Sequence, residues 1–242
     1  MKKIVPVLIS LIVVLNASAQ DSAALKKHYM KVFSQALLYN DVNTAINGLH
    51  GYLAVDNSLL YKDTLSMMYF STKSYYSSLL LAEEVYKTDA ANILAMARAA
   101  ECYDELGDPK TATELFEQVA NKTKNPYHIY KLAVCQYQLK RTAECELSAK
   151  AAMSDTTSKK IGVNFTLANG EQQAVPIDAA AANLLGVLQM DAKNYALAKP
   201  FFNKALTFYP LFAGAKQNLE VCEKNMKGAA KPPVKTTTKP KG

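Results

Sequence analysis

The most constraining feature of this sequence is a fixed spacing of small and large apolar residues. Residues 184–210 show it most clearly, with small side chains at Gly186, Ala198 and Ala205, large ones at Leu185, Phe202 and Leu206, and Pro210 at the end. Small residues let two short antiparallel helices touch, and large residues fill the space between them. Proline cannot continue a helix, so Pro210 ends the second one. The segment therefore predicts a helix-turn-helix unit.

The same pattern recurs along the chain at a regular interval. Earlier units begin near residues 26, 59, 93 and 126, which are separated by 33, 34 and 33 residues, and the unit described above begins near residue 179. In the four earlier units, the positions that take small side chains are occupied by Ala36, Ala45, Ser66, Ser78, Ala82, Ala99, Ala100, Ala112, Ala133, Cys145, Ala149 and Ala152. A repeated period indicates a solenoid of stacked units. The alternative, a helical bundle, would show helical periodicity without a repeat of its small residues.

The order of small, aromatic and proline places resembles the tetratricopeptide repeat, a helix-turn-helix unit of about 34 residues. This resemblance implies an all-α fold: a TPR-type α-solenoid of about five helix-turn-helix repeats. Residues 211–227 continue as a helix that caps the last repeat. The resemblance also implies a non-catalytic scaffold that binds a protein or peptide in a groove lined by the first helix of each repeat.

Groove positions are those that the packing pattern leaves unused. Mapped onto this sequence, they begin at Met30 and continue with Met67, Phe70, Arg98, Glu101, Asp104, Tyr127, Tyr130, Val134, Tyr137, Asn183, Val187 and Met190. The tyrosines either supply contact area for a peptide or only stiffen the wall. The family's carboxylate clamp uses Lys, Asn and Arg. Only Arg98 fits it, because Met30, Ser34 and Thr64 occupy the other places, so the chain is not expected to bind a C-terminal carboxylate in this way.

About 19 extra residues precede the last repeat, and residues 159–177 predict a β-hairpin. Ile161, Val163, Phe165 and Leu167 alternate with smaller or polar residues, which is the period of a half-buried strand. Asn169-Gly170 is a favoured type I′ turn pair. That turn would place Phe165 opposite Ala174 and Val163 opposite Pro176. The apolar face should pack on neighbouring helices, as a stabilising flap or as an element that contacts a partner.

The N-terminus predicts export. Lys2 and Lys3 precede an apolar run at residues 4–15, and Ala17-Ser18-Ala19 forms an Ala-x-Ala cleavage site. Residues 1–19 are therefore expected to be a signal peptide, too short for a transmembrane span, which leaves a solenoid over residues 20–227. The combination resembles exported repeat proteins of Bacteroidota. A periplasmic location is expected, with secretion or outer-membrane association as alternatives.

The formal charge of +7 does not indicate a nucleic-acid partner. Two positive charges belong to residues 1–19 and four to the Pro-, Thr- and Lys-rich tail at 228–242, which leaves +1 on the body. Nucleic-acid binding needs clustered basic residues, and no repeat supplies them. The tail is expected to be disordered. It either solubilises the protein or makes a weak contact with anionic envelope surfaces.

The sequence supplies no catalytic constellation. The three histidines are scattered, and no phosphate-binding loop or nucleophile motif occurs. No enzyme activity, cofactor or metal is therefore expected. The four cysteines are expected to be free and buried, with a Cys135–Cys145 disulfide as the alternative. Alternatives to the scaffold are a structural envelope component attached through its basic tail, a glycan-binding protein or an enzyme.

Overall fold

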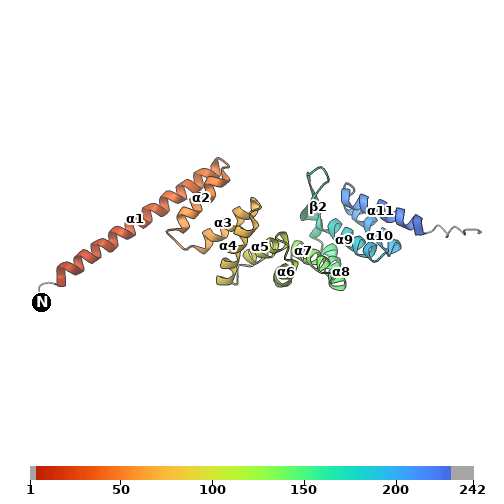
Figure 1. Ribbon diagram of the computed structural model, residues 1–242, viewed down its shortest axis with the longest axis horizontal. Helices are drawn as coiled ribbons and strands as arrows, with labels where there is room; N and C mark the ends of the chain where they lie inside the picture. The colour runs from red at the N-terminus through yellow and green to blue at the C-terminus, as the bar shows by residue number, and fades with distance from the viewer. Residues whose placement is uncertain (1–3, 230–242) are drawn as a thin grey trace, which may run out of the picture. The chain divides into compact units, whose positions relative to one another are not determined.

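The computed structural model describes residues 4–229, and the side chains of residues 21–227. These residues form eleven α-helices, one short 3-10 helix and a two-stranded sheet (Figure 1). The helices of the first half are α1 (Ile4–Leu38), α2 (Val42–Leu53), α3 (Leu59–Ser71), α4 (Tyr75–Thr88) and α5 (Ile93–Glu105). Those of the second half are α6 (Pro109–Thr123), α7 (Pro126–Gln138), α8 (Thr142–Ser154), α9 (Ile177–Asp191), α10 (Tyr195–Phe208) and α11 (Ala213–Ala229). Between α8 and α9 lie η1 (Ser158–Lys160), β1 (Gly162–Thr166) and β2 (Gln172–Pro176).

The chain divides into two compact units, residues 1–107 and residues 108–242. In the first unit, each helix from α1 to α5 packs on the next one along the chain. In the second, the same serial packing runs from α6 to α11. Five successive helix pairs, a final helix and a hairpin before the fifth pair make up the described residues. The predicted fold class, a TPR-type α-solenoid with a capping helix and a β-hairpin insertion, is confirmed.

The turns inside the repeats share one backbone feature. Fourteen positions after the predicted start of each repeat lies a residue with positive φ: Asn40, Lys73, Gly107, Lys140 and Lys193. Beside it, Asp41 N–H donates to Ala36 O at 2.9 Å, and Ser74 N–H donates to Tyr69 O at 2.8 Å. This is the pattern of a Schellman cap, which satisfies the last carbonyls of a helix. The repeat period is therefore present in the backbone as well as in the sequence.

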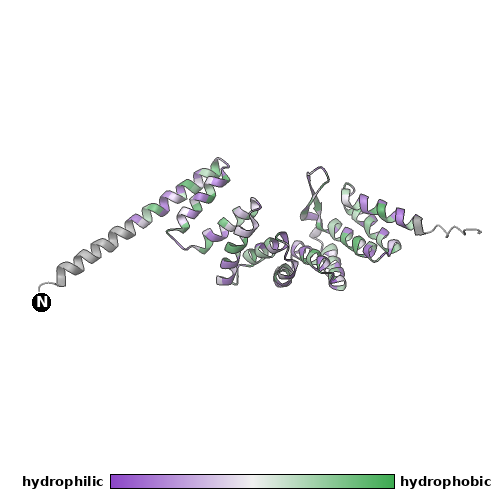
Figure 2. Ribbon diagram, viewed as in Figure 1, coloured by the Kyte–Doolittle hydropathy of each residue, from purple (hydrophilic) through white to green (hydrophobic). Residues whose placement is uncertain are grey.

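The small residues of the repeat pattern lie where the helices pack against each other. The small residues named above for the earlier units are buried, as are Ala198 and Ala205 of the last one. Buried cysteines occupy equivalent positions, and none of the four forms a disulfide, so Cys135 is not joined to Cys145. Figure 2 shows apolar and polar residues interleaved along the helices, as expected when each helix buries one side.

The first helix differs from the prediction. The sequence placed the start of the first repeat near Lys26, but α1 is one helix from Ile4 to Leu38. No glycine or proline lies between residues 7 and 38, so nothing in the sequence ends a helix there. Among residues 21–227, whose side chains the structure describes, no helix combines the length and the apolar character needed to cross a membrane.

The hairpin is present, but its predicted register is wrong by one residue. Val163 pairs with Val175 and Phe165 with Gln173. A type I′ turn needs positive φ at both central residues, and of Asn169 and Gly170 only Gly170 has it, at 84°. Gly170 N–H donates to Leu167 O at 2.9 Å, and Leu167 N–H donates to Glu171 O at 2.8 Å, which closes a three-residue loop. Because side chains alternate, the shift places Val175 on the packed face in place of Ala174.

As expected, the apolar face of the hairpin packs on the helices. Val175 is fully buried, and the ring centroids of Phe165 and Phe212 lie 4.9 Å apart. The Gln173 side chain donates from Nε2 to Leu211 O at 2.8 Å and accepts at Oε1 from Ala213 N–H at 3.1 Å. The hairpin is thereby fixed to the connection between α10 and α11.

The capping helix is present but begins at Ala213 rather than at residue 211. Leu211 is 66% exposed, while Phe212 is fully buried. Phe212 precedes the helix, and Lys216 N–H donates to its carbonyl at 3.1 Å. The helix extends to Ala229, so most of the tail predicted at 228–242 lies outside the described residues.

Candidate functional site

The first helices of neighbouring repeats touch each other within each unit. α3 contacts α5 in the first unit, and α7 contacts α9 in the second, where α9 also contacts α11. We call the surface formed by α3 and α5, and the corresponding surface formed by α7 and α9, the first-helix face of each unit. Of the thirteen predicted groove residues, Met30 lies on α1 and the other twelve lie on these four helices.

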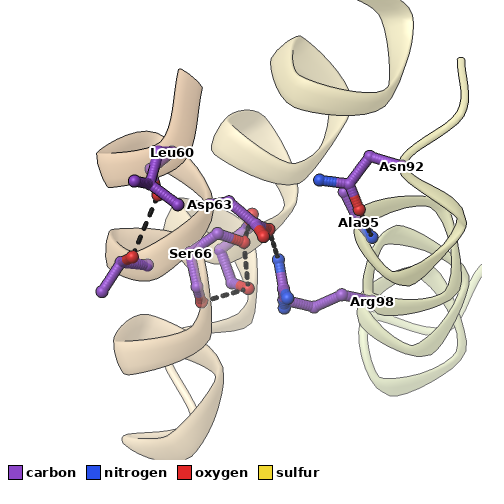
Figure 3. Close-up of polar contacts among 8 residues, drawn as sticks. Leu60, Asp63, Ser66, Asn92, Ala95 and Arg98 are labelled. Atoms are coloured by element: carbon purple, nitrogen blue, oxygen red, sulfur yellow. Dashed lines mark hydrogen bonds and ion pairs between the residues drawn. The ribbon is translucent and has the colours of Figure 1, made fainter. Parts of the chain in front are cut away.

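In the first unit, Arg98 is held by an internal ion pair. Its Nη1 donates to Asp63 Oδ1 at 2.5 Å, which joins α5 to α3 (Figure 3). Both side chains are largely buried. Nearby, Lys62 of α3 pairs with Glu84 of α4. A buried charge that loses its partner is strongly destabilising. We therefore assign Arg98 to the packing of two repeats rather than to a ligand contact.

Three apolar side chains of this face are exposed. Met67 is 50% exposed, whereas Phe70 is partly buried against the ring of Tyr75, and Glu101 and Asp104 are partly buried. Leu60 and Leu94, which the sequence analysis missed, are each 68% exposed. They occupy the place in their repeats that Tyr127 occupies in the fourth, so an alignment of the repeats would have found them.

In the second unit, the tyrosine stripe is not uniformly accessible. Tyr130 is only 5% exposed and packs with Ala133, Cys145 and Ala149 in the main core cluster. Its burial raises the pKa of the phenol. Tyr127 and Val134 are partly buried at the margin of the same cluster. Tyr130 therefore belongs to the core, and its prediction as an accessible groove residue is wrong.

Tyr137 lines a pocket at the end of the face. Its hydroxyl donates to Asp191 Oδ2 at 2.7 Å, and this hydrogen bond raises the pKa of Tyr137 to about 12. A cavity of about 330 Å³ lies beside the pair, lined by Tyr137, Lys140, Thr142, Leu188, Asp191 and Ala192. The sequence predicted only Tyr137 among these. Asp191 follows it by 54 residues, so only the folded chain reveals the pair.

The last three predicted residues contribute to the docking of the cap. Asn218 Nδ2 of α11 donates to Asn183 Oδ1 of α9 at 2.9 Å, and Asn183 is largely buried. Val187 and Met190 pack, partly buried, beside Phe202 and Cys222. Among the described residues, no three His, Cys, Asp or Glu side chains come together in a way that could hold a metal ion.

Comparison with known proteins supports the repeat fold. Residues 94–122 match the family model of the tetratricopeptide repeat. Among curated proteins, no sequence matches the chain.

Solved structures share the fold at low sequence identity. YrrB, described as a tetratricopeptide-repeat protein with an unusual peptide-binding site, is 13% identical, with a TM-score of 0.64 over 79% of this chain and 90% of its own. MamA from Desulfovibrio magneticus RS-1 is 12% identical, with a TM-score of 0.64 over 78% of this chain and 97% of its own. A tetratricopeptide-repeat protein from Parabacteroides merdae is 12% identical, with a TM-score of 0.66 over 84% of this chain and 74% of its own.

Proposed function

We propose that this protein is a non-catalytic scaffold that binds a protein or peptide partner through its first-helix faces. The observation that carries the proposal is the set of accessible apolar and aromatic side chains on helices that already touch each other. In the first unit Leu60, Met67 and Leu94 are exposed, and in the second Tyr127 and Tyr137 are partly exposed at the margin of the core. Exposed apolar groups gathered on one face are typical of interaction sites. Tyrosine adds contact area at low entropic cost.

The peptide-binding site described for YrrB supports the proposal as a property of a protein with the same fold. The ion pair between Arg98 and Asp63 supports it in another way, because it fixes α3 against α5 and holds Leu60 and Leu94 in place. A rigid face loses less entropy when it binds a partner.

Site-specific photocrosslinking in the producing cells tests the proposal. A photoreactive phenylalanine analogue replaces Met67 in one variant and Tyr137 in another. Leu147, which is 70% exposed on the second helix α8, is the matched control. We expect a defined partner adduct at positions 67 and 137 and none at 147. Equal adducts at all three positions, or an adduct at 147 alone, would contradict the proposal.

We further propose that the protein is exported and acts in the cell envelope, with the periplasm as its location. The support is the basic start, the apolar run and the Ala17-Ser18-Ala19 site. N-terminal sequencing of protein from its native source should then begin at Gln20. A chain that retains Met1 and cofractionates with the cytoplasm would overturn this part of the proposal and leave the binding face untouched.

A further inference from the structure

One edge of the hairpin offers unused backbone groups. Ile177 N–H donates to Ile161 O at 2.9 Å, and Leu167 N–H donates to Glu171 O at 2.8 Å. Hydrogen-bonded pairs alternate along an antiparallel ladder, so the odd-numbered residues of β1 bond to β2. The N–H and C=O groups of Gly162, Asn164 and Thr166 therefore point away from β2, and all three residues are exposed.

The two edges of the hairpin are not equally protected. β2 ends at Pro176, which has no N–H to donate, and proline commonly protects the edge of a sheet. β1 reads Gly-Val-Asn-Phe-Thr and contains neither proline nor lysine. The edge of β1 is thus the one that can accept another strand.

A pocket lies beside this edge. It has a volume of about 370 Å³ and is lined by Phe165, Thr166, Leu167, Ala168, Asn169, Phe212, Ala213, Gly214 and Gln217. β1 and the turn contribute to it, whereas β2 contributes none of its lining residues. Phe165 and Leu167 are on the packed side of the hairpin, so a strand added to β1 would direct alternate side chains toward the pocket.

Positive charge lies at the start of the same edge. Lys159 and Lys160 lie just before β1, separated from it by Ile161. Both are exposed, and neither forms an ion pair with any residue described in the structure. A strand that runs antiparallel to β1 would end next to them. Their charge therefore complements an acidic C-terminal end of such a strand.

We propose that the β1 edge binds an extended segment of a partner protein by strand addition, with an apolar side chain in the pocket and acidic residues at Lys159 and Lys160. This site is separate from the first-helix face and goes beyond the function proposed above. The main-chain bonds to Gly162, Asn164 and Thr166 give affinity, and the pocket gives specificity. The contacts of Phe165 and Gln173 with the connection between α10 and α11 hold the edge rigid before the partner arrives.

The probe is the acetylated peptide Thr-Leu-Thr-Val-Thr-Asp-Asp, added to isotope-labelled full-length protein and followed by NMR. In the proposed register its leucine lies opposite Phe165 and its third residue opposite Asn164. We expect the largest amide shifts at Gly162, Asn164 and Thr166. Absence of shifts at these three amides, or shifts confined to the first-helix face, would overturn the proposal.

Two N-methylated peptides distinguish main-chain hydrogen bonding from nonspecific binding. Methylation of the third residue removes the N–H that donates to Asn164 O and should weaken binding roughly tenfold or more. Methylation of the fourth residue, whose N–H points away from β1, is the matched control and should leave affinity unchanged. Equal losses for the two peptides would refute strand addition.

Two proline substitutions in the hairpin provide a matched test on the protein side. Asn164 and Ala174 are directly cross-strand from each other. Asn164→Pro removes the outward N–H of β1 and should abolish binding, whereas Ala174→Pro does the same on the opposite edge and should not. The amide signal of Val175 reports whether each hairpin is intact. If Asn164→Pro disrupts it, the N-methylated peptides decide the question. Tyr137→Ala, which alters the first-helix face, should leave peptide affinity unchanged.

Discussion

Replacing Gly186 by alanine tests the helix contact on which the repeat depends. A β-carbon at Gly186 would lie 2.5 Å from Cε1 and 2.7 Å from Cδ1 of Phe202, well inside van der Waals contact. Phe202 is fully buried between α9 and the cap, so its ring has little space to move away. The added methyl group must therefore separate α9 from α10 or force the ring from its rotamer.

Two opposing effects set the magnitude. Overpacking of a buried site costs roughly 1–3 kcal/mol, while glycine to alanine inside a helix stabilises by about 1 kcal/mol. The net expectation for Gly186→Ala is a loss of about 1 kcal/mol of unfolding free energy. Gly51→Ala is the matched control. Its β-carbon would also meet an aromatic ring, that of Tyr29, but Tyr29 is only partly buried and can turn aside. We expect that variant to be neutral or up to about 1 kcal/mol more stable.

Urea unfolding followed by circular dichroism measures both variants. With a slope of about 2 kcal/mol per molar urea, Gly186→Ala should lower the midpoint by roughly 0.5 M. Adding Phe202→Leu should recover part of the loss, because the smaller side chain leaves room for the methyl group. A Gly186→Ala protein as stable as the Gly51→Ala protein would show that the close approach of α9 and α10 does not require glycine.

Further predictions follow from the second unit and the tail. Because the pKa of Tyr137 is raised from 10.0 to about 12, its share of stability is fully present below pH 10 and is lost as pH rises through 12; Asp191→Asn should lower this pKa in an NMR titration of the tyrosine ring. Burial raises the pKa of Cys145 to about 11, so iodoacetamide at neutral pH should modify the thiols only after unfolding. Gln173→Ala removes both bonds from the hairpin to the α10–α11 connection, and hydrogen exchange should show faster opening of the hairpin while the helices keep their protection. Deletion of residues 228–242 should leave partner binding intact; loss of a salt-sensitive envelope association would instead favour the structural component attached through its tail.

The sequence by itself determined the repeat. Helices α3, α5 and α7 begin at residues 59, 93 and 126, where the spacing of small residues placed them. The buried alanines and the absence of a disulfide among the four buried cysteines were also predictable. The reason is local: within one helix pair, contacts between helices depend on side-chain size at fixed spacings, and a pattern repeated along the chain makes those spacings visible.

Local sequence was weaker where more than one backbone conformation was available. Asn169-Gly170 fits a two-residue turn, yet the chain uses a three-residue loop that buries Val175 and bonds Gln173 to the α10–α11 connection. Four of the five repeat turns place a lysine or asparagine at positive φ where glycine would be expected. The packing of the two helices fixes such a turn and offsets the local strain.

Only the tertiary structure decided which groove residues are accessible. The repeat pattern treats Tyr127, Tyr130 and Tyr137 alike, but Tyr130 is enclosed by the core while Tyr137 bonds to Asp191 on another helix. Arg98 likewise forms an ion pair with Asp63 of the preceding repeat. Periodicity specifies the side of a helix on which a residue lies. The neighbours that cover or bond to it come from distant parts of the chain, and their positions follow from how the helices pack.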